Sequence, residues 1–247
     1  MPSLGDVPLP TIRAGSPRLT GVLGVPDGDG PWAGIVIVHE AFGVTDVMRR
    51  QVERCAAAGF VVLMPDLFAD GGPRRCLRAT FRDLVRGAGR AFDDVDSARR
   101  VLAGRDDCTG RVGVLGFCMG GAFALLLAQG TGYGASGVSY GRLPRRLDEH
   151  LVGACPMVGS YGARDLSLRG SAARLEAALV RHGVPHDVKE YPGAGHAFLD
   201  DEPPRTGNAV LDLVMQQVLH LDPALEAAAD AWRRIDGFFR QHLGATG

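Results

Sequence analysis

The sequence predicts an α/β fold, a mostly parallel central sheet with helices on both faces. Short apolar segments alternate with amphipathic helical segments along the chain, which is the pattern that builds such sheets. The length of 247 residues suits one domain, and we expect residues 1–247 to form it. A glycine-rich turn between an apolar strand and a helix, at residues 116–121, is a further α/β feature.

The first half of the chain contains three predicted strands, at 19–25, 34–38 and 60–64, each short and apolar. A helix is predicted over 46–58, because Thr45 or Asp46 can cap its start and Gly59 can end it. Residues 70–89 open with Gly71-Gly72-Pro73, and we expect an irregular segment that forms part of a cleft wall.

The second half begins with an amphipathic helix over 91–103, whose apolar face carries Phe92, Val95 and Leu102. Strands follow at 111–115, 135–139, 153–160 and 187–191, and helices at 122–129, 171–181 and 223–242. Ligands of such folds bind at the carboxyl ends of the strands, so functional residues are expected there.

The composition excludes several classes of protein. The net charge is −1, with 46% apolar and 22% charged residues, so general attraction to nucleic acid or to an anionic membrane is not expected. The first residues resemble no signal peptide, and no apolar run is long enough to span a bilayer. Five cysteines, an odd number without a C-x-x-C pair, argue against a disulfide framework or a zinc site and favour the cytoplasm.

The segment Gly116-Phe117-Cys118-Met119-Gly120-Gly121 has the nucleophile-elbow pattern G-x-S-x-G, with cysteine in place of serine. Small residues are needed because the elbow is a sharp, strained turn. The N–H groups of the following helix would favour a thiolate at Cys118. The alternative is a glycine-rich turn with an inert, buried cysteine.

A nucleophile of this kind needs a histidine and an acid from later strand ends. His196 lies in a glycine-rich loop after the strand at 187–191, and His39 is the next candidate. Asp165 follows the strand at 153–160 and would orient the imidazole, although a helix-capping role is the commoner explanation for such an aspartate. Glu40, at the end of the strand at 34–38, could accept the thiol proton or could be a surface glutamate.

These blocks together resemble the dienelactone hydrolases, a branch of the α/β-hydrolase fold. The resemblance covers about residues 10–242 and rests on the elbow, on Val38-His39-Glu40-Ala41-Phe42-Gly43-Val44, on Met64-Pro65-Asp66-Leu67-Phe68, on Gly162-Ala163-Arg164-Asp165 and on Ala194-Gly195-His196-Ala197-Phe198.

The resemblance implies a cysteine-dependent hydrolase of lactones or carboxylic esters, like a carboxymethylenebutenolidase. It implies a triad of Cys118, His196 and Asp165, with Glu40 interacting with the thiol. The backbone N–H groups of Met119 and Ala41 match the family's oxyanion hole. No metal and no organic cofactor is implied, and the expected partner is a small-molecule substrate bound by a monomer or small homo-oligomer.

The chain departs from the family where members hold a substrate carboxylate with arginines. Acidic residues 200–202 occupy the region just after His196, while Arg78, Arg82 and Arg205 are the candidate cations. Phe42 and Phe198 are further candidate substrate contacts. Two alternatives remain: another acyl-transfer enzyme on this fold, such as a thioesterase or peptidase, and a catalytically silent binding protein.

Overall fold

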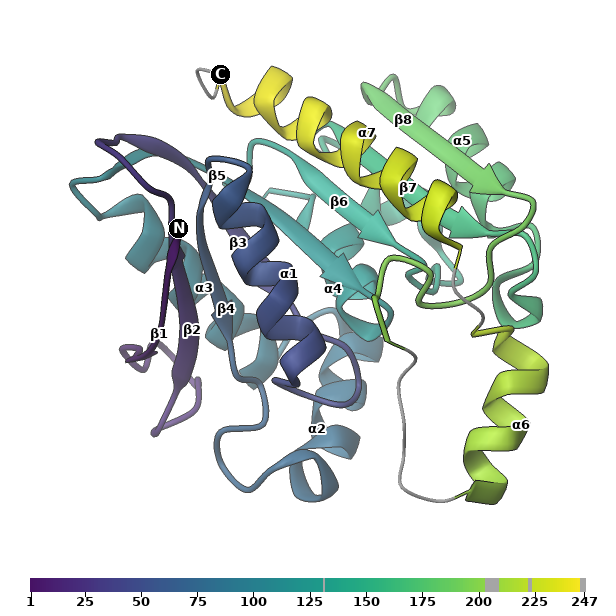
Figure 1. The fold of residues 1–247 in the computed structure, drawn as a ribbon, viewed down its shortest axis with the longest axis horizontal. Helices are drawn as coiled ribbons and strands as arrows, with labels where there is room; N and C mark the ends of the chain where they lie inside the picture. Colours follow the sequence, from purple (N-terminus) through teal and green to yellow (C-terminus); the bar gives the residue numbers. More distant parts are fainter. Residues whose placement is uncertain (131, 203–208, 222–223, 245–247) are drawn as a thin grey trace.

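The structure, a computed structural model, describes residues 1–130, 132–202, 209–221 and 224–244. Within them, eight strands form one sheet with helices on both faces, which confirms the predicted α/β fold (Figure 1). The strands are β1 (Ser3–Pro8), β2 (Thr20–Val25), β3 (Trp32–Val38), β4 (Val61–Pro65), β5 (Cys108–Phe117), β6 (Ser136–Ser139), β7 (Met157–Gly162) and β8 (His186–Tyr191).

The strand order is β1-β2-β4-β3-β5-β6-β7-β8. The strands from β4 to β8 in this order are parallel, while β1 and β2 pair antiparallel at one edge. Strands β3, β4 and β6 are almost wholly buried, as expected for strands covered on both faces. The carboxyl ends of β3, β5, β7 and β8 therefore meet at one edge of the sheet, where the predicted site residues follow them.

Helices cover both faces of the sheet (Figure 1). The first face carries α1 (Asp46–Ala57) and α7 (Leu225–Leu243), and the second carries α3 (Arg90–Ala103), α4 (Met119–Leu127) and α5 (Ser171–Arg181). Thr45 caps α1 by accepting the Met48 N–H at 3.3 Å, as one of the two predicted caps. No described helix is long and apolar enough to cross a membrane.

The segment predicted to be irregular is instead a helix, α2 (Pro73–Arg86). Pro73 stands in its first turn, where a missing N–H costs nothing, and Gly87 ends it in the left-handed conformation. Strand β1 and helix α6 (Ala209–Leu219) were not predicted either, and α6 contacts the short 3₁₀ helix η2 (Leu166–Leu168). Strand β7 begins at Met157, later than predicted, because Gly153 lies in a turn with φ 68°.

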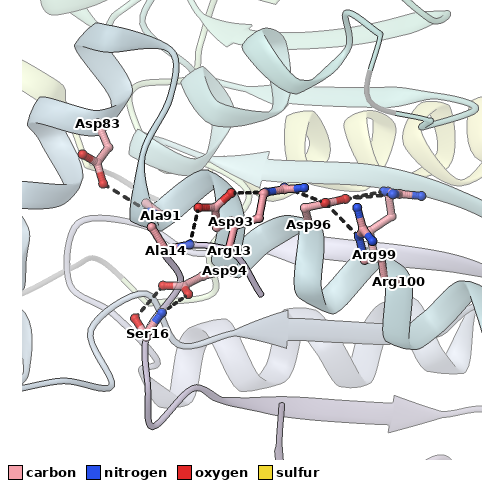
Figure 2. Close-up of polar contacts among 10 residues, drawn as sticks. All are labelled: Arg13, Ala14, Ser16, Asp83, Ala91, Asp93, Asp94, Asp96, Arg99 and Arg100. Carbon is pink, nitrogen blue, oxygen red and sulfur yellow. Dashed lines mark hydrogen bonds and ion pairs between the residues drawn. The ribbon is translucent and has the colours of Figure 1, made fainter. Parts of the chain in front are cut away.

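The connection between β1 and β2 is tied to α3 by a polar cluster (Figure 2). Asp94 is buried and accepts hydrogen bonds from the Ser16 N–H at 2.6 Å and the Ser16 hydroxyl at 2.7 Å. Arg13 donates to Asp93 and Asp96, each at 2.7 Å. These contacts bind the antiparallel edge of the sheet to α3, at the end of the sheet where β4 finishes.

Candidate active site

Cys118 lies between β5 and α4 in a strained backbone conformation, with φ 53° and ψ −113°. This is the elbow that the sequence predicted. A Cβ at Gly116 would overlap the Gly120 carbonyl, and a Cβ at Gly120 would overlap the Val38 carbonyl, so the turn admits only glycine at both positions. The Cys118 N–H donates to the Ser139 carbonyl at 3.0 Å. The elbow therefore holds a partly exposed thiol in place.

Three residues that are far apart in the chain converge here. The Asp165 Oδ2 lies 2.5 Å from the His196 Nδ1, and the nearby Cys118 contributes to the raised pKa of the His196 ring. Asp165 follows β7 and is fully buried, and its Oδ1 accepts the Ser167 N–H at 2.9 Å and the Ser167 hydroxyl at 2.6 Å. The structure thus brings the imidazole of His196 and the carboxylate of Asp165 together near the thiol of Cys118.

The loop that carries His196 is fixed from outside the site. The His196 N–H donates to the carbonyl of Leu219, the last residue of α6, at 2.7 Å. Ala197, the next residue, has φ 55°. The Tyr140 ring packs against the imidazole with 5.0 Å between centroids. These contacts restrict the imidazole to an orientation that serves both Cys118 and Asp165.

The electrostatics of the chain favour an imidazolium. Burial opposes a charge on His196, but its hydrogen bonds with Asp165 and Cys118 outweigh burial and raise the pKa of His196 to about 10. Burial also raises the pKa of Asp165, yet the bonds with His196 and Ser167 prevail and lower it below its usual range. Asp165 is therefore a carboxylate that stabilises the protonated ring.

Glu40 lies directly beyond β3 and is 4% exposed, so it is not a surface glutamate. Its Oε1 is buried without a hydrogen-bond partner among the described residues. Burial raises the pKa of Glu40, and the nearby Cys118 raises it further, whereas a hydrogen bond with Asp200 lowers it. The carboxyl group accordingly faces the thiol in an environment that resists its ionisation.

His39, the other histidine considered as a base, is engaged elsewhere. Its Nε2 accepts the Leu67 N–H at 3.1 Å, so its Nδ1 carries the proton and donates to the Glu40 carbonyl at 2.6 Å. Burial lowers the pKa of His39, which keeps the ring neutral. It therefore fixes the backbone that presents Glu40 and has no free nitrogen for the thiol.

Two backbone N–H groups lie beside the elbow. Met119 is the first residue of α4, where the helix offers its N–H no acceptor, and Ala41 follows Glu40. Neither N–H has a hydrogen-bond acceptor in the part of the chain that the structure describes. Both are available for an oxygen atom bound near the Cys118 sulfur.

The acidic stretch after His196 divides into two parts, which the sequence did not reveal. Asp201 and Glu202 pair with Arg50 of α1, at 2.5 and 3.2 Å. Asp200 contacts Glu40, and its Oδ1 accepts hydrogen bonds from Gln51 and Tyr140. In the sequence, the position of Asp200 four residues after His196 was the signal that it could lie near the site. The direction of its side chain depends on contacts with α1, which the local sequence does not specify.

The predicted substrate contacts have different surroundings. Arg78 and Arg82 are exposed on α2, and Arg205 lies outside the described residues. Phe198 is 3% exposed and packs on Tyr140 and Tyr191, whereas Phe42 is half-buried beside Ala41. Of these five, the structure places Phe42 and Phe198 next to the residues of the site.

Comparisons with known proteins identify the family of the chain. Residues 19–243 match the sequence profile of the dienelactone hydrolase family. A carboxymethylenebutenolidase from Rhodococcus opacus is 29% identical over 224 residues, which cover 85% of this chain and 81% of that protein.

Solved structures share the fold. A dienelactone hydrolase-like promiscuous phosphotriesterase from metagenomic libraries has a TM-score of 0.79 at 20% identity, and a dienelactone hydrolase from Anabaena variabilis has a TM-score of 0.69 at 20% identity. Each comparison covers 98% of this chain and 99% of the other. The chain therefore belongs to the dienelactone hydrolase family of the α/β-hydrolase superfamily and is a hydrolase of that type.

Proposed function

We propose that this protein hydrolyses a lactone or carboxylic ester with Cys118 as its nucleophile. The observation that carries the proposal is the hydrogen-bonded pair of His196 and Asp165 near Cys118, which stands in the strained elbow. The name of the Rhodococcus opacus relative, a carboxymethylenebutenolidase, supports the same class of substrate.

In the proposed reaction the Cys118 proton resides on His196, as an imidazolium, and the thiolate attacks the carbonyl carbon of the substrate. The N–H groups of Met119 and Ala41 stabilise the oxyanion, each by about 3 kcal/mol. The intermediate then expels an alkoxide, which His196 protonates, and leaves an acyl group on the sulfur. His196 next deprotonates a water molecule, which hydrolyses the thioester and restores the thiol. Asp165 stabilises the imidazolium during both steps.

The remaining cysteines are poor nucleophiles by comparison. Cys55, Cys76 and Cys108 are buried. Cys155 is partly exposed, but burial of its thiol raises its pKa to about 12. All five cysteines are free thiols, which supports our proposal of a reducing, cytoplasmic location.

The test is to replace Cys118 and to measure ester hydrolysis. Cys118→Ala should lower kcat/KM by at least about 10³-fold, since loss of a triad nucleophile usually has such an effect. Cys155→Ala is the control and should retain activity. Peptide mapping after iodoacetamide inactivation should find the modified residue at Cys118. Near-full activity in Cys118→Ala would rule out the cysteine mechanism.

A substrate panel separates the proposal from its alternatives. We expect turnover of neutral lactones and aryl esters. Faster turnover of acyl thioesters or peptides than of either would assign the site to a thioesterase or peptidase. Absence of turnover throughout the panel would favour a binding protein on the hydrolase fold.

A further inference from the structure

Positive charge is concentrated on the exposed side of α2. The 14 residues of this helix include five arginines and a single acid, Asp83, which gives a formal charge of +4. The net charge of the whole chain is −1, so the average conceals this concentration. All five arginines are exposed, namely Arg74, Arg75, Arg78, Arg82 and Arg86.

The arginines share one face of the helix. At about 100° per residue, the arc from Phe81 to Arg86 covers about 140° of the helix circumference. This arc contains the five arginines together with Phe81 and Val85, and we refer to these residues as the basic face. Every side chain of the basic face is exposed, whereas the buried Cys76 and Thr80 lie on the opposite side of the helix. The basic face extends about 18 Å along the helix axis.

The acids that adjoin α2 do not neutralise the basic face. Asp83 accepts the Ala91 N–H at 3.2 Å, and Asp70 pairs with Arg90 at 3.2 Å and with Arg18 at 3.8 Å. Within the part of the chain that the structure describes, the side chains of the five arginines form no hydrogen bond and no ion pair. Their charge is therefore available to an anionic partner outside the chain.

Two apolar side chains lie among these cations. Val85 is 87% exposed and Phe81 is 42% exposed. A helix face that combines arginines with apolar side chains suits the surface of an anionic bilayer, because guanidinium groups bind lipid phosphates and the apolar groups enter the acyl boundary. A nucleic acid could pair with the arginines and stack on Phe81, but it would offer Val85 no comparable gain. The combination therefore favours lipid.

The start of α2 lies close to the candidate active site. A Cβ added at Gly43 would lie 3.6 Å from the Cγ of Pro73, the first residue of α2. Gly43 belongs to the loop that follows Glu40 and Ala41. A surface that binds α2 would therefore lie near this loop.

We propose that the basic face of α2 docks this protein on bilayers that contain anionic phospholipids. The guanidinium groups bind the lipid phosphates, and Val85 and Phe81 enter the boundary between headgroups and acyl chains. Because attraction between exposed charges is screened by ions, the docking weakens as the salt concentration rises. The proposal does not depend on the chemistry proposed for Cys118.

Vesicle flotation tests the docking on the intact chain. The wild type should bind vesicles of mixed phosphatidylglycerol and phosphatidylcholine at least about tenfold more tightly than vesicles of phosphatidylcholine alone, and high salt should release it. Arg74→Gln/Arg86→Gln should weaken binding to the anionic vesicles at least about fivefold. The matched control is Arg145→Gln/Arg169→Gln, which removes the same charge from exposed positions outside α2 and should bind like the wild type.

A second variant separates a bilayer from other anionic partners. Val85→Gln keeps all five positive charges, so it should weaken binding to the anionic vesicles about threefold and leave binding to single-stranded RNA or polyglutamate unchanged. Val180→Gln is its control, because Val180 is an exposed valine on α5, and it should bind vesicles like the wild type.

Each contrary result overturns the proposal. Equal binding to the two kinds of vesicle, or wild-type binding by Arg74→Gln/Arg86→Gln, would show that the basic face does not dock on lipid. Tighter binding of the wild type to RNA or polyglutamate than to vesicles, unaffected by Val85→Gln, would assign the face to a nucleic acid or an acidic protein. None of these measurements uses turnover, so a wild type without esterase activity would refute the proposed function and leave the docking results valid.

Discussion

At the scale of single residues, the protonation of His196 governs the proposed chemistry. Asp165 and Cys118 raise the pKa of His196 to about 10 despite burial, so the ring can protonate a leaving alkoxide throughout the neutral range. In the pH profile of kcat/KM for a neutral ester, the decline on the alkaline side should therefore have its midpoint near pH 10.

Replacing the carboxylate should move this midpoint. Asp165→Asn removes the anion that stabilises the imidazolium, so the midpoint should fall by at least about one pH unit, together with a lower maximal rate. The control is Asp187→Asn, because Asp187 pairs with Arg234 on the surface. If the alkaline decline of kcat/KM has the same midpoint in the wild type and in Asp165→Asn, His196 does not control that decline.

Substrate charge is a second question at this scale. Glu40 and Asp200 place acidic groups near Cys118, and Arg78 and Arg82 are exposed on α2. We expect kcat/KM for a neutral lactone to exceed that for its carboxylated analogue by about tenfold. Preference for the carboxylated compound, lost in Arg78→Ala or Arg82→Ala, would instead show that α2 provides the clamp.

At the scale of elements, the elbow depends on close contact between β3, β5 and α4. Because a Cβ at Gly116 would overlap the Gly120 backbone, Gly116→Ala should destabilise the fold by several kcal/mol, on the order of 3, and abolish activity. Gly237 in α7 has open space around it, so Gly237→Ala should stabilise the protein by about 0.5–1 kcal/mol at full activity. Urea unfolding measures both, and equal stability of the two variants would contradict the role assigned to the elbow.

At the scale of the whole molecule, stability should decline as the pH rises above neutral. His196 has a raised folded pKa, so its contribution is complete below 6.5 and is lost as the pH approaches about 10. Burial also raises the pKa of Glu40 and of Asp200, so the ionisation of these groups at rising pH lowers stability in the same direction. Asp165, whose pKa is lowered, acts in the opposite direction, but only below its usual value of 3.8.

Urea unfolding at pH 6 and pH 9 checks this. We expect the free energy of unfolding to be lower at pH 9 by on the order of 1 kcal/mol. His196→Gln should reduce the difference between the two pH values, whereas His182→Gln, a surface variant, should not. Stability that rises from pH 6 to pH 9 would refute the assigned direction.

Predictions from the sequence were most accurate where local chemistry is decisive. The strand–helix alternation, the elbow and the cap of α1 depend on residues within a few positions of one another. The helix α2 was missed although Pro73 and Gly87 stand at positions typical of a helix start and end, because Gly71-Gly72-Pro73 also suits a loop. Strand β1 depends on pairing with β2, which local pattern does not specify.

For this protein, the sequence alone determined the α/β class, the strained turn around Cys118 and the order of its candidate partners, because propensity, glycine geometry and apolar periodicity act locally. Only the tertiary structure decided which charges meet. Asp200, Asp201 and Glu202 are adjacent and chemically alike, yet one contacts Glu40 and two pair with Arg50. That division arises because burial and electrostatic partners depend on distances in space, which the local sequence does not specify.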